Sequence, residues 1–167
     1  MATSLGERPR WRHGKNMVQD LDMTDMNPDE ELERLAELYV ATHVTVEING
    51  GWVSAPVAVR LIGQPLHVIT AWNPGDDRPT DAQNEAANSL LLSDLEILGT
   101  RVLRALGSDP NSDHAEKSWA VAGISDESAI ELGVKYGQVA IFRLEAESQT
   151  VLSCDGTWSR SRDYSQS

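Results

Sequence analysis

Three asparagines near the middle of the chain are the residues that most invite a chemical role. Asn84 and Asn88 stand four residues apart in a stretch with helical periodicity, and both fall on or beside its apolar face. A buried amide without partners costs on the order of 1–3 kcal/mol, so both side chains need hydrogen bonds. Asn73 precedes Pro74 and Gly75 in the turn just upstream, close to the first turns of that helix.

Two interpretations of these amides remain open. In one, they hold the loop by bonding its backbone N–H and C=O groups, while Asn73 forms an Asx-type turn into Pro74. In the other, part of their bonding capacity meets a ligand at the helix N-terminus. The two are compatible, because a binding site also requires a rigid loop. We expect the amides to serve the loop first, and we place any site at the strand–loop–helix joint of residues 70–88.

Other polar residues are expected to reach the same end of the sheet. Trp72 ends one expected central strand and Trp119 opens another, so their rings could wall an apolar pocket or simply fill the core. Glu116 could act there as a general base or be no more than a solvated loop end. The candidate ligand-binding residues are Thr70, Trp72, Asn73, Asn84, Asn88, Glu116 and Gln138.

The remaining chemistry-bearing residues form no recognised catalytic or metal-binding pattern. Four histidines stand singly, at 13, 43, 67 and 114, without the spacing of zinc ligands. Asp76, Asp77 and Asp81 match no calcium loop and suit turn and helix-cap roles. The P-loop, G-x-G-x-x-G and G-x-S-x-G motifs are absent, and Cys154 has no histidine near it in sequence. We therefore expect no metal and no cofactor.

Composition and charge narrow the class of protein. The 167 residues suffice for one domain, and 40% of them are hydrophobic, as in ordinary globular chains. With 14 Lys and Arg against 26 Asp and Glu, the formal net charge is -12, which repels nucleic-acid phosphates and anionic membranes. A single cysteine suits a reducing compartment, and no apolar run approaches the roughly 18 residues of a membrane span. We expect a soluble cytoplasmic protein whose partner is a small molecule or a protein, with no nucleic acid and no membrane.

The elements that position the candidate residues follow from apolar periodicity. The Asn27-Pro28 pair suits the start of a short helix that runs to about Tyr39. Period-two alternation then predicts strands at 43–48 and 57–61, joined by the Asn49-Gly50-Gly51 turn. The domain is therefore expected to open with a helix and a meander.

The rest of the chain is expected to alternate strands with two main helices. The predicted strands are 66–72, 100–106, 117–124 and 138–144, with at most one further edge strand at 150–153, and the predicted helices are 80–98 and the stretch from Ser125 or Asp126 to Gly137. Strand–helix–strand units favour a mixed sheet with its helices packed against it. The expected fold class is α+β: a single domain with a mixed β-sheet of about six strands, two main helices packed on it and a short N-terminal helix.

The two ends of the chain differ in composition from the middle. Residues 1–26 mix Gly, Pro, Arg and Met without a sustained period, which predicts a disordered leader with a basic first half. The stretch from Asp155 onward is rich in Ser and Arg. We expect a disordered leader at 1–26, one α+β domain at 27–153 and a loose C-terminal tail at 154–167.

Several short motifs resemble a bacterial family of unknown function. They are the Ile69-Thr70-Ala71-Trp72-Asn73-Pro74 run, the Asn84-x-x-x-Asn88 pair, Glu116-x-Ser118-Trp119, Tyr136-Gly137-Gln138 and the earlier Tyr39-x-x-Thr42. Together they are similar to the domain-of-unknown-function family numbered three-two-nine-three, over roughly residues 39–142. Gln83 stands where an acid is expected and Val139 where an amide is usual, and these departures weigh against a catalytic role. The resemblance implies a small cytoplasmic bacterial domain and supplies no activity.

Three function classes follow from these observations, in order of preference. The first is a small-ligand-binding or regulatory module with its site at the 70–88 joint. The alternative is a protein–protein interaction module that docks through its acidic surface or the basic leader. An enzyme of unrecognised type comes third, because His, Lys and Cys do not cluster in the sequence.

Overall fold

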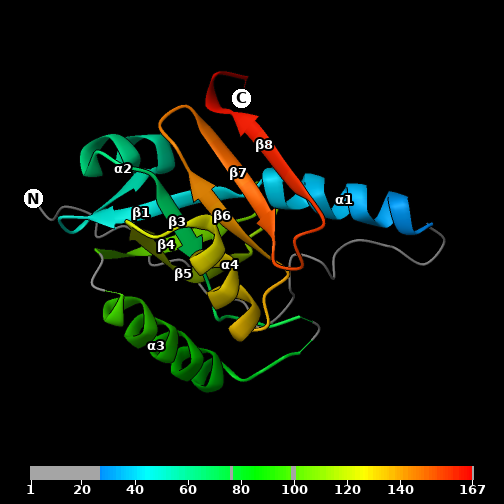
Figure 1. The fold of residues 1–167 in the computed structure, drawn as a ribbon, viewed down its shortest axis with the longest axis horizontal. Helices are drawn as coiled ribbons and strands as arrows, with labels where there is room; N and C mark the ends of the chain where they lie inside the picture. Colours follow the sequence, from blue (N-terminus) through cyan, green and yellow to red (C-terminus); the bar gives the residue numbers. More distant parts are fainter. Residues whose placement is uncertain (1–26, 76, 99–100, 167) are drawn as a thin grey trace, which may run out of the picture.

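The protein is an antiparallel β-sheet with helices on both of its faces (Figure 1). The computed structural model describes residues 27–75, 77–98 and 101–166, and the predicted leader at 1–26 lies outside them. Within these residues eight strands follow the order β2-β1-β4-β5-β3-β6-β7-β8, and each neighbouring pair is antiparallel. The strands are β1 (His43–Ile48), β2 (Gly51–Ser54), β3 (Leu66–Ile69), β4 (Val102–Ser108), β5 (Ala115–Ala122), β6 (Ala140–Leu144), β7 (Ser148–Ser153) and β8 (Ser159–Asp163).

The helices divide between the two faces. They are α1 (Pro28–Val40), α2 (Ala55–Ile62), α3 (Asp81–Ile97) and α4 (Asp126–Lys135), and a 3-10 turn follows β8 at Tyr164–Gln166. On one face α2 covers β1 while α1 runs beside β7 and β8; on the other, α3 lies against β4 and β5, and α4 against β3 and β6. Figure 1 shows α3 and α4 as neighbours, with α2 and α1 away from them. Across the described residues, no helix is both long and apolar enough to cross a membrane.

Each face of the sheet has its own apolar core. Because successive strand residues point to opposite faces, β3 contributes Leu66 and Val68 to the core under α1 and α2. Ile69 points the other way and packs with Leu91 of α3. His67 also points toward the α4 face, where its Nε2 lies 2.7 Å from a carboxylate oxygen of Asp126. All four residues of β3 are buried, as expected of a central strand covered on both sides.

Helix starts follow the expected capping chemistry. The Asn27 side chain accepts from the backbone N–H of Glu30, and the Glu30 carboxylate accepts from the Asn27 N–H, which closes a capping box. Thr80 and Gln83 form a second box, with Gln83 N–H to Thr80 Oγ1 at 3.2 Å and Thr80 N–H to Gln83 Oε1 at 2.9 Å. The second box fixes the start of α3, and with it the positions of Asn84 and Asn88 on the helix.

The strand predicted at 57–61 is wrong, because these residues belong to α2. The alternation of apolar residues there competes with a helical period, in which Ala55, Ala58 and Val59 are the buried positions. Pro56 suits the first turn of a helix as well as the start of a strand. The left-handed Gly63, with φ 81°, then ends the helix.

The predicted mixed sheet of about six strands is also wrong in detail. Strand–helix–strand units do occur, but another strand lies between the two that each helix connects: β5 between β3 and β4, and β3 between β5 and β6. The connected strands therefore run in the same direction without pairing. The sheet gains further strands from β2 and β8. The tail expected to be loose at 154–167 contains β8, which pairs with β7 along Ser159–Asp163.

Candidate functional site

Residues 70–75 leave the end of β3 and form a tightly held loop. Thr70 Oγ1 donates to the carbonyl of Lys117 in β5 at 2.7 Å and accepts from the Trp72 N–H at 3.0 Å. Asn73 has φ 47°, in the left-handed region that asparagine tolerates better than most residues. The Asp77 N–H donates to the Pro74 carbonyl at 3.0 Å and closes the turn.

Asn84 and Asn88 hold this loop from the α3 side. Asn84 Oδ1 accepts from the Asn73 backbone N–H at 2.9 Å, and its Nδ2 donates to Asn73 Oδ1 at 2.9 Å. Asn88 Oδ1 accepts from the Ala71 N–H at 2.9 Å, and its Nδ2 donates to the Lys117 carbonyl at 3.0 Å. Both side chains are buried. The geometry therefore favours the structural interpretation, in which these two amides fasten the loop to α3 and β5.

A narrow slot opens on the opposite side of the loop, toward α1. It lies between the end of α1, the first residues of β5, the 73–75 turn and the entry into β6. Its empty volume is about 550 Å³ when the solvent at its mouth is counted, but the centre of a water molecule can occupy only about 30 Å³ of it. The slot therefore admits a group of few atoms. Its polar lining side chains are Tyr39, Thr42, Thr70, Asn73, Glu116, Ser118 and Gln138.

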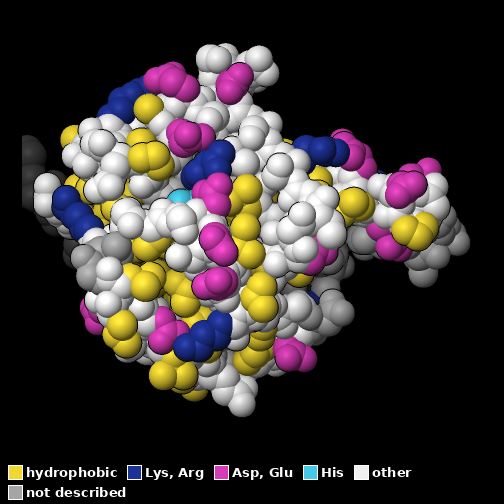
Figure 2. Space-filling model, viewed as in Figure 1, with side chains coloured by type: hydrophobic (Ala, Val, Ile, Leu, Met, Phe, Trp, Pro, Cys, Tyr) yellow, Lys and Arg dark blue, Asp and Glu magenta, His cyan; other side chains and the backbone are white. Residues whose placement is uncertain are grey.

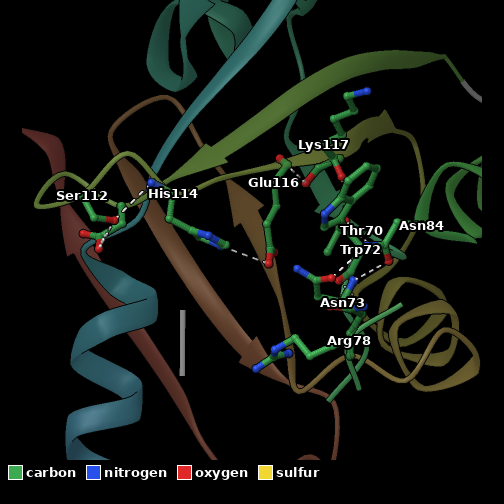
Figure 3. A network of polar contacts seen from close by, with 12 residues as sticks. Thr70, Trp72, Asn73, Arg78, Asn84, Ser112, His114, Glu116 and Lys117 are labelled. Atoms are coloured by element: carbon green, nitrogen blue, oxygen red, sulfur yellow. Dashed lines mark hydrogen bonds and ion pairs between the residues drawn. The ribbon is translucent and has the colours of Figure 1, made fainter. Parts of the chain in front are cut away.

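Glu116 brings a carboxylate into this slot. Its Oε1 lies 3.2 Å from Nε2 of His114, and the two side chains are only 14% and 16% exposed. In Figure 3 Glu116 lies between His114 and Asn73, and the side chains of Asn73 and Glu116 point toward each other. His114 therefore holds the carboxylate from the side away from Asn73. No three His, Cys, Asp or Glu side chains gather as a metal site in the part of the chain that the structure describes.

Tyr39 adds a phenol and an aromatic wall. Burial, together with the negative charge of Glu116, raises the pKa of the Tyr39 phenol well above its usual value. The phenol therefore stays protonated and keeps its hydrogen-bond donor across the physiological range. Its ring lies 6.3 Å from that of Phe142, tilted by 44°, and both rings line the slot.

The seven predicted ligand-binding residues divide between the slot and its support. Those that line the slot are Thr70, Asn73, Glu116 and Gln138, and those that do not are Trp72, Asn84 and Asn88. Trp72 lies beneath Lys117, whose Nζ is 5.4 Å from the ring centroid, and the Trp72 carbonyl accepts from Gln138 Nε2 at 3.3 Å. Trp119 donates from Nε1 to the Asn88 carbonyl at 2.9 Å and packs in the core under α3 and α4. The two tryptophans therefore do not wall the slot.

Four polar residues at or beside the slot were missing from the predicted set. Tyr39 and Thr42 enter from the end of α1 and the turn that follows it, Ser118 belongs to β5, and His114 precedes β5. Tyr39-x-x-Thr42 is visible in the sequence as a motif. However, Tyr39 also continues the helical spacing of Leu35 and Leu38, which assigns its side chain to the apolar core. His114 and Glu116 alternate in an extended segment, so a period-two pattern would have placed both side chains on one face.

Comparison with known proteins finds a family without an assigned activity. A family model described as "Protein of unknown function (DUF3293)" matches residues 69–141. This confirms the resemblance inferred from the motifs, and the matched stretch runs from the end of β3 into β6. It contains Asn73, Glu116 and Gln138, whereas Tyr39 and Thr42 lie upstream of it. No curated protein and no solved structure matches the chain.

Proposed function

We propose that the chain is a small-ligand-binding or regulatory module, whose site combines residues of the stretch matched by this family model with Tyr39 and Phe142, which lie outside it. The site is the slot beside Asn73. A few convergent polar groups against an aromatic wall are the usual composition of such sites. Here the polar groups are the Glu116 carboxylate and the Asn73 amide, and the wall is formed by Tyr39 and Phe142.

The state of Asn73 is the observation that supports this proposal most strongly. Its side chain lines the slot although the residue is only 6% exposed, and its backbone is left-handed. The carboxamide oxygen bonds Asn84, but Nδ2 has no hydrogen-bond partner among the described residues. Nδ2 is not one of the fully buried side-chain atoms that lack a partner, so it is open to solvent at the slot and available to a ligand oxygen. Asn73 thus combines a strained backbone with a side-chain donor that no protein group uses, and strained residues of this kind cluster at ligand sites.

A thermal-shift screen against a library of metabolites tests the proposal, with each hit mapped by its effect on backbone amide chemical shifts. We expect hits to perturb residues 73, 116 and 138 first, because these side chains face the slot. Gln138→Ala should weaken binding, whereas the matched substitution Gln83→Ala, in the exposed capping box of α3, should not. The proposal is overturned if every hit maps outside the slot, or if no compound raises the melting temperature.

A protein–protein interaction module is a second candidate, supported by one surface feature. Leu90 and Ile97 stand seven residues apart on α3 and share its outer face, and Ile97 is 82% exposed. Figure 2 shows apolar side chains at the surface over α3, at the lower left. Co-purification from the host distinguishes this candidate: a protein partner should be lost with the double substitution Leu90→Lys and Ile97→Lys. Retention of the same partner would exclude this face.

A further inference from the structure

The charge and shape of the slot narrow the class of ligand. We propose that it selects a small primary amine that carries a neutral oxygen acceptor a few bonds from its ammonium group, as an amino alcohol or an amino amide does. This inference rests on the proposed function and adds the chemistry of the ligand.

Charge favours a cation in the slot. Of the described residues that line it, Glu116 alone carries a formal charge, and its side chain is only 14% exposed. A carboxylate withdrawn from water attracts a cation more strongly than one on the surface does. The formal net charge of -12 also raises the concentration of cations around the molecule. A ligand with its own carboxylate meets no lysine or arginine in this lining.

The aromatic wall favours a cation for a separate reason. Tyr39 and Phe142 both line the slot, with their rings tilted by 44° at 6.3 Å. An ammonium group within about 6 Å of an aromatic ring is attracted by the ring quadrupole, and more strongly when the site is desolvated. A carboxylate beside two aromatic rings therefore selects an organic cation over a neutral molecule of the same shape.

The two free donors of the slot call for an oxygen on the ligand. Asn73 Nδ2 has no partner among the described residues, and the protonated phenol of Tyr39 makes no hydrogen bond that the structure records. Both groups donate, so they repel the N–H groups of an ammonium and suit a hydroxyl or carbonyl oxygen. Because Asn73 and Glu116 face each other, the ligand oxygen and the ammonium group belong a few bonds apart.

Size excludes bulky cations. The volume of the slot that is open to the centre of a water molecule is about 30 Å³. This corresponds to roughly two water positions. One such position suits a primary ammonium group beside Glu116, and the other suits an oxygen beside Asn73. Three methyl groups on nitrogen require more room than this, so a quaternary ammonium should be rejected.

Titrations monitored by amide chemical shifts at millimolar probe concentration test the inference with a matched set of compounds. Ethanolamine carries both groups, ethylamine lacks the oxygen, ethylene glycol lacks the ammonium, glycine adds a carboxylate, and choline adds three methyls. We expect ethanolamine to shift the amides of residues 73, 116 and 138 saturably, and each of the others to bind about tenfold more weakly or not at all.

Two variants separate charge from fold. Glu116→Gln keeps the shape of the side chain and should weaken ethanolamine binding by about tenfold or more. Glu147→Gln removes the same charge from an exposed ion pair with Arg60, outside the slot, and should leave binding unchanged. Should Glu116→Gln not fold, the compound set on the unaltered protein still decides the matter.

The possible failures can be told apart. If ethylene glycol binds as well as ethanolamine, if ethanolamine shifts no slot residue, or if binding survives Glu116→Gln, the amine inference is wrong. The proposed ligand site would still stand if a library compound without an ammonium group maps to the slot. If no compound of either experiment maps there, both proposals fail.

Discussion

Asn84 and Asn73 bond each other twice, once through the backbone N–H of Asn73 and once through its side-chain oxygen, at 2.9 Å in both cases. This pair ties the first turns of α3 to a loop residue whose backbone is left-handed. The buried polar side chain of α3, Asn84, therefore bonds directly to the strained residue of the loop, Asn73. Because the pair occupies the carboxamide oxygen of Asn73 but not its nitrogen, α3 orients a donor into the slot without lining it.

Removing the Asn84 side chain should destabilise the whole domain. Asn84→Ala leaves the Asn73 N–H buried without an acceptor, and we expect a loss of about 2–3 kcal/mol in the free energy of unfolding. Urea denaturation measures it. Ser89→Ala, on the exposed face of the same helix, is the matched control and should change stability by less than about 0.5 kcal/mol. Equal effects of the two substitutions would contradict a fastening role for Asn84.

Gly137 is expected to tolerate no side chain, for two separate reasons. Its φ is +69°, and a Cβ added there would lie 2.9 Å from the Cβ of Pro74 in the slot-forming loop. Gly156 has a similar φ of +74°, but an added Cβ would meet nothing within 4 Å. Gly156→Ala therefore measures the backbone cost alone, about 1–2 kcal/mol. Gly137→Ala should cost about 1 kcal/mol or more beyond that, because the loop must shift.

The comparison is made by urea denaturation of the two variants beside the unaltered protein. A loss in Gly137→Ala no larger than that in Gly156→Ala would mean that the contact with Pro74 is absent in solution. A larger loss, together with chemical-shift changes in the amides of residues 73–75, would support close packing of the helix end on the loop.

Local chemistry explains what could be predicted of the fold. Asn27 and Thr80 begin helices because the side chains of these residue types accept from backbone N–H groups two or three positions later, a signal that is local in sequence. The order of the strands in the sheet depends on contacts between residues distant in sequence. No local sequence pattern therefore predicts that β5 lies between β3 and β4. The sequence did not predict β8, because this strand lies at the edge of the sheet and its residues show no apolar alternation.

The same distinction applies to the candidate site. Thr70, Asn73 and Glu116 could be selected because polar residues at the ends of buried strands stand out in the sequence. Tyr39 could not, because its spacing fits an apolar stripe and only the tertiary structure brings the end of α1 over the slot. The helical wheel placed Asn84 on the buried face correctly, but it could not tell that the slot opens on the opposite side of the loop.

Asp126 should make stability sensitive to acid. Its Oδ1 lies 2.7 Å from Nε2 of the buried His67, and its other oxygen pairs with Arg143. Burial acts to raise the pKa of the Asp126 carboxyl, but the His67 hydrogen bond and the Arg143 charge outweigh it and hold the pKa below its usual value. A lowered pKa in the folded state stabilises the protein fully above the unfolded value of about 4, and this contribution is lost as pH falls through the folded value.

Asp126→Asn should therefore reduce the free energy of unfolding at pH 7, and the difference from the unaltered protein should shrink below about pH 4. We expect about 1 kcal/mol at pH 7, because the Asp126 side chain is 41% exposed and solvent screens its charge. Urea denaturation at pH 7, 4 and 3 measures it. Glu127→Gln, in the same first helical turn, serves as the control. A difference for Asp126→Asn that is as large at pH 3 as at pH 7 would rule out the ionic contribution.

Cys154 should react with alkylating reagents only when the protein opens. Its side chain is buried against α4, where a Cβ added at Gly133 would lie 2.5 Å from its Sγ. Burial, with a smaller contribution from the charge of Asp155, raises the pKa of the Cys154 thiol to about 11. At pH 8 only about one thiol in a thousand is then the reactive thiolate. Iodoacetamide should therefore label the native protein at least about 100-fold more slowly than the urea-unfolded chain.

Gly133→Ala tests whether packing on α4 is what protects the thiol. The added methyl group must displace Sγ or move α4 away from the sheet, so we expect a loss of about 1–3 kcal/mol in the free energy of unfolding. Labelling of Cys154 should accelerate in the same variant, because the helix that covers it opens more often. Gly156→Ala, only two residues from Cys154 but free of close contacts, should accelerate labelling less. Rapid labelling of the unaltered protein at pH 8 would show that the thiol is accessible without opening of α4.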